Sequence, residues 1–461
     1  MIFGAIFPAA IASAENPRAT ATYQRIKASL DAVPAIDTHD HLYPFELIPG
    51  IVETPRGPGM TLASLWRGSY LSRIHRFPQW PASGSFEAWW SAAKGGFDEV
   101  RATSCYRYTQ IAIQDLYGVD SDTITDEQAR AVNERVFENY RDQRWLFHVI
   151  TERANIELMF NDPHWAPLDL ETHYPFEVLV FRVNSPIRGF HPARPMKLSE
   201  NPYAYARKAN VEVKTFDDYL ALIESMFQHA KAAGAACLKT TVAYERTLRF
   251  EKVTKEAAAR AFGRAPDQVT AQEVQDFEDF IMWRLCELSA KYELPFQIHT
   301  GVGRIQGSNP MLLVDLIEAN PKTKFILFHG GYPWIGETGV IAMKELGTAR
   351  NVWIDSVWLP TISISAAKRA YHEWIEALPA DRIMWGADCN HPEGIYGATE
   401  LTRRCIAEVL SEKVERGDLR EEHALQIGRN ILRENALTLF PQLRERLWKG
   451  KGKLEPPAPG R

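Results

Sequence analysis

The sequence predicts an α/β fold of the (β/α)8 class, the TIM-barrel architecture, with a helical insertion after the first strand. Short β-rich runs alternate with helical runs along most of the chain, which favours a parallel sheet. Eight such β-rich runs occur, and eight strand–helix units favour a closed barrel over an open sheet. The predicted strands are residues 35–41, 156–160, 177–183, 235–244, 295–300, 324–330, 351–356 and 381–388.

The helical segments follow in an order that fits this fold. Residues 18–33 predict a helix that leads into the first strand. Residues 47–150 are rich in aromatic residues and helical in pattern, and they form the predicted insertion. Helical segments such as 216–234 and 275–294 separate later strands. Because the insertion follows the first strand on the catalytic side of a barrel, we expect it to cap the pocket, with its Trp and Tyr residues shaping substrate choice.

The two ends of the chain are set apart from the barrel, which is predicted for residues 16–445. Residues 1–15 contain an apolar stretch that ends in Ala-Ser-Ala, the pattern of a signal-peptide cleavage site, although no Lys or Arg precedes it. A cleaved signal peptide would mean export to the periplasm, and its absence would mean a cytoplasmic protein. The Gly- and Pro-rich residues 446–461 predict a disordered tail.

Composition gives no support for a nucleic-acid or membrane partner, and a small-molecule substrate is expected. The net charge of −5 over 461 residues is too mild to favour nucleic acid or an anionic membrane surface. No run of 18 apolar residues occurs, so no membrane span is predicted. The 5 cysteines are widely separated and form no CxxC motif, which argues against a disulfide framework or a thiolate zinc site. A homo-oligomer is compatible with the sequence, and nothing in it fixes the arrangement.

Polar residues stand at the C-terminal ends of the predicted strands, where (β/α)8 barrels carry their chemistry. Residues i and i+2 of a strand point to the same side, so His39 and His41 should project together. Later strand ends supply four further candidates: Lys239, His299, His329 and Asp388. Imidazole and carboxylate groups gathered from separate strands are the ligands of a divalent metal.

The order HxH, Lys, His, His, Asp along eight strands resembles the amidohydrolase superfamily over residues 34–440. The stretches IDTHDHL, PFQIHTG, FILFHGG and WGADCNHPEGIYG resemble the amidohydrolase-2 type branch. DSVWLP, HEWIEALPADRIMWGAD and GRNILRENALTLF are similar to metal-dependent hydrolases distantly akin to uronate isomerases. The resemblance implies one or two divalent metals per chain and hydrolysis of amide or ester bonds.

The resemblance also implies roles for the five His and Asp residues. His39 and His41 would hold the more buried metal together with Asp388, with zinc as the first expectation and manganese or nickel as alternatives. His299 and His329 would hold a second metal; alternatively, His299 binds a single metal and His329 polarises the substrate. Asp388 would act as general base, accepting a proton from the activated water and returning it to the leaving group.

Lys239 separates the one-metal from the two-metal version. In two-metal members of the superfamily a lysine on the fourth strand is carbamylated and bridges the metals, and Lys239 stands where that lysine is expected. A bare ammonium offers donors but no acceptor and cannot bridge. The alternative is an unmodified lysine that binds a substrate carboxylate or pairs with Glu245.

Five further residues are candidates for contact with the substrate: Arg182, Tyr244, Arg246, Trp358 and His391. Arg182 ends the third strand and could meet an anionic group or pair with a neighbouring acid. Tyr244 and Arg246 follow Lys239 towards the pocket rim. Trp358 could form a pocket wall or belong to the core, and His391 lies three residues beyond Asp388.

Together these features predict a metal-dependent hydrolase that cleaves an amide, ester or lactone bond of a small molecule. A uronate-type sugar isomerase and a non-oxidative decarboxylase are alternatives on the same barrel, and each needs a single metal. A non-catalytic metal or ligand binder is the alternative from another class. The intact set of His39, His41, His299, His329 and Asp388 counts against it.

Overall fold

A computed structural model describes residues 16–163, 170–197, 200–344 and 351–449. The predicted signal peptide, residues 1–15, lies outside the described residues, as do residues 450–461 of the predicted tail. Residues 446–449 belong to a helix instead, α21 (Leu443–Lys449). Among the described residues, no helix combines the length and the apolar character that crossing a bilayer requires.

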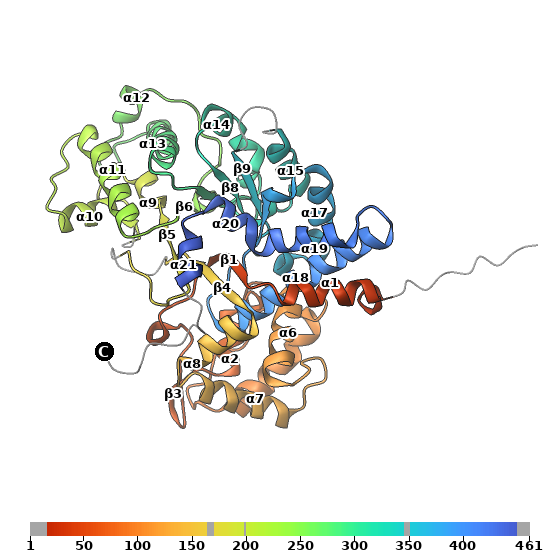
Figure 1. Cartoon of the computed structure of the whole chain (residues 1–461). Helices are drawn as coiled ribbons and strands as arrows, with labels where there is room; N and C mark the ends of the chain where they lie inside the picture. The colour runs from red at the N-terminus through yellow and green to blue at the C-terminus, as the bar shows by residue number, and fades with distance from the viewer. Residues whose placement is uncertain (1–15, 164–169, 198–199, 345–350, 450–461) are drawn as a thin grey trace, which may run out of the picture.

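Eight parallel strands form the barrel, which confirms the predicted fold (Figure 1). Each strand pairs with the next along the chain in parallel register. The strands are β1 (Ala35–Asp40), β4 (Ile156–Asn161), β5 (Glu177–Arg182), β6 (Cys237–Thr240), β7 (Phe296–Ile298), β8 (Phe325–Leu327), β9 (Val352–Asp355) and β10 (Ile383–Met384). Several are shorter than predicted because the polar residues at their C-terminal ends leave the hydrogen-bonded ladder and turn towards the pocket.

Backbone hydrogen bonds between β1 and the segment after β10 close the barrel. The N–H of Thr38 donates to the carbonyl of Trp385 at 3.2 Å, and the N–H of Asp388 donates to the carbonyl of His39 at 2.9 Å. Gly386 makes this approach possible, since a Cβ there would lie 3.0 Å from the backbone nitrogen of His39. The closure therefore sets Asp388 beside the HxH motif.

Helices surround the sheet, and their N-termini are capped by side chains of the expected type. Thr215 forms a capping box with Asp218, and Thr270 forms one with Glu273. The helix predicted at 18–33 is confirmed as α1 (Ala21–Asp31). The others outside the insertion are α9 (Asn184–Arg188), α10 (Pro202–Lys208), α11 (Phe216–Ala232), α12 (Lys255–Ala259), α13 (Ala271–Tyr292), α14 (Val314–Ala319), α15 (Ile335–Lys344), α16 (Leu359–Ile362), α17 (Ile364–Ala377), α18 (Pro392–Glu415), α19 (Glu421–Arg429) and α20 (Asn435–Leu439).

The insertion between β1 and β4 forms the orange and gold lobe below the barrel in Figure 1. It contains a two-stranded hairpin, short helices and a π-helical turn at His148–Arg153. Its elements are β2 (Val52–Thr54), β3 (Gly57–Gly59), α2 (Leu62–Gly68), α3 (Leu71–Ile74), α4 (Phe86–Ala93), α5 (Phe97–Val100), α6 (Ser104–Tyr117), α7 (Asp126–Asn139) and α8 (Arg144–Phe147). The predicted helical insertion at 47–150 falls within this lobe.

The tryptophans of the insertion build its own core. Trp66, Trp89 and Trp90 are buried, and the ring of Trp66 lies 4.3 Å from that of Phe97. None of these four rings lines the pocket at the strand ends. These tryptophans bury the apolar surface of the lobe itself, whereas Tyr70 and Tyr108 of the insertion do line the pocket.

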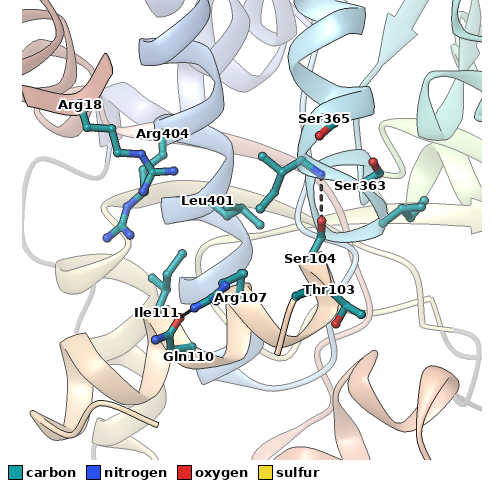
Figure 2. Close-up of a pocket in the computed structure, with 13 residues that line it drawn as sticks. Arg18, Thr103, Ser104, Arg107, Gln110, Ile111, Ser363, Ser365, Leu401 and Arg404 are labelled. Atoms are coloured by element: carbon teal, nitrogen blue, oxygen red, sulfur yellow. Dashed lines mark hydrogen bonds between the residues drawn. The ribbon is translucent and has the colours of Figure 1, made fainter. Parts of the chain in front are cut away.

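A buried carboxylate fastens the insertion to the barrel. Glu393, in the first turn of α18, accepts hydrogen bonds from the hydroxyls of Tyr117 at 2.7 Å and Tyr140 at 2.5 Å, and from the indole N–H of Trp145 at 2.9 Å. All three donors belong to the insertion. Above this contact, α6, α17 and α18 border a cavity of about 710 Å³, where the hydroxyl of Ser104 accepts a hydrogen bond from the N–H of Ile364 (Figure 2).

Removing this carboxylate should weaken the fold. We expect Glu393→Ala to lower the free energy of unfolding by about 3 kcal/mol, because it leaves two buried hydroxyls and an indole N–H without their acceptor. Chemical denaturation measures this change. Glu415→Ala, at an exposed glutamate on the same helix, should change it by less than about 0.5 kcal/mol. Equal effects of the two substitutions would contradict a fastening role.

Candidate metal centre

A pocket of about 610 Å³ opens at the C-terminal ends of the barrel strands. The structure brings all six predicted metal-site residues to its lining: His39, His41, Lys239, His299, His329 and Asp388. Part of the opposite wall comes from the insertion, which supplies Gly68, Tyr70 and Tyr108. The insertion thus contributes to the pocket, as expected from its position after the first strand.

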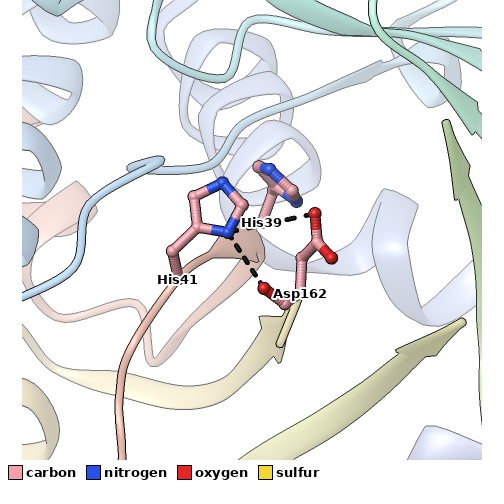
Figure 3. A group of neighbouring side chains, drawn as sticks. All are labelled: His39, His41 and Asp162. Atoms are coloured by element: carbon pink, nitrogen blue, oxygen red, sulfur yellow. Dashed lines mark hydrogen bonds and ion pairs between the residues drawn. The ribbon is translucent and has the colours of Figure 1, made fainter. Parts of the chain in front are cut away.

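The HxH motif, Asp162 and Asp388 form the first group of possible ligands. The rings of His39 and His41 project together, with centroids 4.7 Å apart. His39, His41 and Asp162 can each offer one ligand atom within 4.8 Å of the others (Figure 3). Asp388 joins them, because its Oδ1 lies 3.3 Å from Nε2 of His41 and 3.8 Å from Nε2 of His39.

The hydrogen bonds of this group fit a bound cation. Nδ1 of His41 lies 3.0 Å from the carbonyl of Asp162, to which it can only donate. In the neutral ring Nε2 then carries a lone pair, and it faces the carboxylate of Asp388 as one acceptor facing another. A proton or a metal ion is needed between them. His39 is also poised as a ligand, because its buried Nδ1 has no hydrogen-bond partner among the described residues and burial lowers its pKa well below the usual value.

His299 and His329 form the second group. Nδ1 of His329 lies 3.1 Å from the carbonyl of Val357, so it donates there and leaves the lone pair at Nε2. That Nε2 lies 2.8 Å from Nδ1 of His299, which therefore donates to it. Nε2 of His299 is buried and has no partner among the described residues. Burial lowers the pKa of His329 to about 4 and also lowers that of His299, so both rings are neutral. The unused lone pair is the one at Nε2 of His299, because Nε2 of His329 accepts the hydrogen bond from His299.

Asp388 is held ionised and fixed in place. Burial alone would raise its pKa, but the interaction with His41, supported by the charge of Lys239, outweighs burial and holds the pKa well below the usual range. Its carbonyl accepts a hydrogen bond of 2.6 Å from the hydroxyl of Tyr70, a residue of the insertion. The insertion and the site are therefore directly connected.

Lys239 is fully buried and lies close to both groups. Its Nζ lies 3.6 Å from the centre of the Phe328 ring and has no hydrogen-bond partner among the described residues. Burial lowers its pKa to about 7. Lys239 lines the same pocket as both groups, and its charge contributes, after burial, to the lowered pKa of His39 and of His299.

Three site residues have left-handed backbone angles where they follow their strands. The φ angles are 61° at His329, 63° at Trp358 and 58° at Asp388. Such angles cost a non-glycine residue on the order of 1 kcal/mol or more, and they persist only where the surroundings enforce them. They turn these side chains off the sheet and towards the pocket.

The predicted substrate contacts divide into two sets. Arg182, Tyr244 and Trp358 line the pocket. The structure does not bring Arg246 or His391 to that lining: the guanidinium of Arg246 pairs with Glu278 and Asp279 at 3.0 and 2.6 Å, and His391 lines a small separate cavity against the insertion. Arg182 reaches the pocket but forms ion pairs with Asp162 and, at 3.6 Å, with Glu200. The two carboxylates therefore largely balance the positive charge of Arg182.

Sequence reasoning missed Asp162 and the residues that the insertion contributes. Asp162 directly follows β4, so its position at a strand end was the available signal. Tyr70, Arg67 and Arg73 line the pocket from helical segments whose orientation no local pattern reveals.

The fold and these residues define a (β/α)8 barrel protein with a centre that can hold a divalent metal. Residues 190–442, more than half of the chain, match the family model described as amidohydrolase. The chain belongs to the amidohydrolase family. Protein fluG of Emericella nidulans is 32% identical over 152 residues, which are 32% of this chain and 17% of that protein. The chain thus matches only a small part of that relative.

Solved structures share the fold over nearly the whole chain. A uronate isomerase from Thermotoga maritima has a TM-score of 0.70 at 15% identity and covers 91% of this chain and 97% of its own. A glucuronate isomerase from Caulobacter crescentus has a TM-score of 0.69 at 14% identity and covers 97% of both chains. A protein from Lactobacillus casei described as a metal-dependent hydrolase has a TM-score of 0.60 at 18% identity, with 91% of this chain and 98% of its own covered.

Loss of either HxH imidazole should remove metal from the protein. We expect His39→Ala and His41→Ala to weaken zinc binding more than about 100-fold, because each removes a ligand that the protein holds in place. Competition with a chromophoric chelator measures the affinity. His372→Ala, at a histidine on α17 that pairs with Glu412, is the control and should bind zinc like the wild type. Unchanged affinity in both HxH variants would exclude this group as the metal centre.

Proposed function

We propose that this protein is a metal-dependent hydrolase that cleaves an amide, ester or lactone bond of a small molecule. The observation that carries the proposal is that Lys239, buried and without a hydrogen-bond partner among the described residues, lines the same pocket as two groups of possible metal ligands. An ammonium group in that place would repel the cations that both groups are suited to bind. A carbamate in the same place would attract them.

The chemistry of Lys239 supports carbamylation. Because burial lowers its pKa to about 7, a sizeable share of the side chain is a neutral amine near neutral pH. The amine nitrogen can attack the carbon of carbon dioxide and release one proton, which forms a carbamate. The two carbamate oxygens are acceptors and can serve as ligands, whereas the ammonium can only donate.

Two sets of residues would hold the metals. His39, His41, Asp162 and Asp388 suit one ion, and His299 and His329 suit a second. A divalent metal at such a centre supplies Lewis-acid polarisation of a carbonyl oxygen and lowers the pKa of water. The tautomer of His329 favours the ligand role over that of a substrate polariser, because its one N–H donates to Val357 and Nε2 offers only a lone pair.

Asp388 is the proposed proton carrier. Its carboxylate is ionised, so an oxygen can accept a proton from the attacking water and return it to the leaving nitrogen or oxygen. The hydrogen bond from Tyr70 and the backbone bond to His39 limit its movement. Trp358, which packs on Tyr70 with ring centroids 4.6 Å apart, forms a wall that helps to keep other water out.

A uronate-type isomerase is the second candidate. The observation that favours it is the fold likeness to solved uronate and glucuronate isomerases, which covers nearly the whole chain. This candidate requires one metal, and it leaves Lys239 as an unmodified amine that can bind a substrate carboxylate.

Metal content separates the two candidates. Protein produced with bicarbonate and zinc should contain about two metals per chain, and Lys239→Ala should contain one or none, because the bridging ligand is lost. Elemental analysis measures both. Lys413→Ala, which removes another buried lysine on α18, should keep the wild-type content. One metal per chain in both the wild type and Lys239→Ala would instead support the isomerase.

Activity tests the reaction itself. Against a panel of small amides, esters, lactones and uronates, the wild type should hydrolyse at least one of the first three classes. Asp388→Asn should lower kcat/KM for that substrate by at least about 100-fold, since an amide is a far weaker proton acceptor. Asp315→Asn, at an exposed aspartate, should have no effect. Isomerisation of a uronate without any hydrolysis would overturn the proposal.

A further inference from the structure

The described lining of the active-site pocket carries an excess of positive side chains. Asp388 is its one carboxylate. The cationic residues in the lining are Arg67, Arg73, Arg182, Lys197 and Lys239. Asp162 and Glu200 form ion pairs with Arg182 and balance its charge, and Lys239 belongs to the metal centre. The three remaining cationic side chains, Arg67, Arg73 and Lys197, are exposed and lie towards the mouth of the pocket. Arg67 and Arg73 belong to the insertion.

These two arginines have no carboxylate partner among the described residues, although the guanidinium of Arg73 lies 5.6 Å from the centre of the Tyr70 ring. Arg67 lies in the last turn of α2 and Arg73 in the last turn of α3, and both are exposed. Neither guanidinium forms an ion pair or a hydrogen bond with another described residue. Two arginines on one wall of a pocket, both free of a carboxylate, can receive one from a ligand in bidentate geometry.

A second cavity shows how the chain treats arginines that have a structural role. Three arginines line the cavity between α6, α17 and α18 (Figure 2). Each is paired with a carboxylate at a hydrogen-bonded distance: Arg18 with Glu408 at 2.5 Å, Arg107 with Asp122 at 2.9 Å and Arg404 with Glu400 at 2.7 Å. Arg67 and Arg73 differ from these three in having no carboxylate partner within the described ranges.

Contacts of Tyr70 fix the position of the segment that carries Arg67 and Arg73 relative to Asp388. Tyr70 lies between them in the sequence, donates to the carbonyl of Asp388 and stacks on Trp358. Trp358 lines the pocket, and its buried indole N–H has no acceptor among the described residues. The position of the two arginines relative to Asp388 is therefore set by direct contacts.

From this arrangement we infer that the substrate carries a carboxylate remote from the bond that reacts, and that Arg67 and Arg73 of the insertion bind it. The inference rests on the proposed function for the location of the reacting group. It assigns the role of specificity element to the insertion through α2 and α3. Uncharged amides, esters and lactones of the same size should be poorer substrates than their carboxylate-bearing counterparts.

Isothermal titration calorimetry with two probes tests the inference on the zinc-loaded protein. Butyrate has one carboxylate, which can reach only the metal or only the arginines, whereas glutarate is one carbon longer and has two. We expect glutarate to bind the wild type at least about tenfold more tightly than butyrate, the size of one charge-assisted contact. The double variant Arg67→Ala/Arg73→Ala should lose this advantage, and Arg67→Lys/Arg73→Lys should keep part of it.

Arg76→Ala provides the matched control, because Arg76 is exposed in the same segment and does not line the pocket. It should retain the full preference for glutarate. Equal affinities of the two probes in the wild type, or a preference that survives in the double alanine variant, would overturn the inference. Zinc content is measured for every variant. A protein that binds glutarate through the arginines but hydrolyses nothing would refute the proposed hydrolase and leave this inference standing.

Discussion

The hydrogen bonds that close the barrel between β1 and residues 385–389 determine the position of the site. They join the first strand to the last, so the HxH motif and Asp388 come together only when all eight strands have paired. Two buried acids add hydrogen bonds to this closure of the barrel. Asp37 accepts from the N–H of His39 and, at 3.2 Å, from that of Ala387, while Asp40 accepts from the N–H of Cys389 at 2.6 Å. These carboxylates hold backbone, and the imidazoles stay available for a metal.

The insertion is attached to the same region of the barrel, just after β10. Tyr70 binds the carbonyl of Asp388, and Glu393, five residues further on, receives three donors from the lobe. One short stretch after β10 therefore orients the proposed proton carrier and fastens the lobe that covers it. Because Tyr70 contacts the backbone of Asp388 directly, a shift of the lobe would move that backbone, and the carboxylate with it.

Charge is distributed differently in the depth of the site and at its mouth. In the depth, Asp162 and Glu200 balance Arg182, and burial keeps the histidines neutral. At the mouth, the guanidinium groups of Arg67 and Arg73 have no carboxylate partner in the part of the chain that the structure describes. A buried charge must be compensated within the fold, because its desolvation is costly. An exposed charge is solvated by water and can remain unpaired until a ligand binds.

The sequence alone determined the barrel and most of the metal centre. Alternating strands and helices specify a parallel sheet, and the two-residue period of a strand fixes that His39 and His41 point together. Tertiary structure decided what depends on distant neighbours. Asp162 joins the HxH group only because β4 pairs with β1. Arg246 is not available to a substrate because two acids of α13 form ion pairs with it. Local pattern fixes the direction of a side chain, but the partner that satisfies its charge comes from another part of the chain, so only the folded structure reveals which charges remain for a ligand.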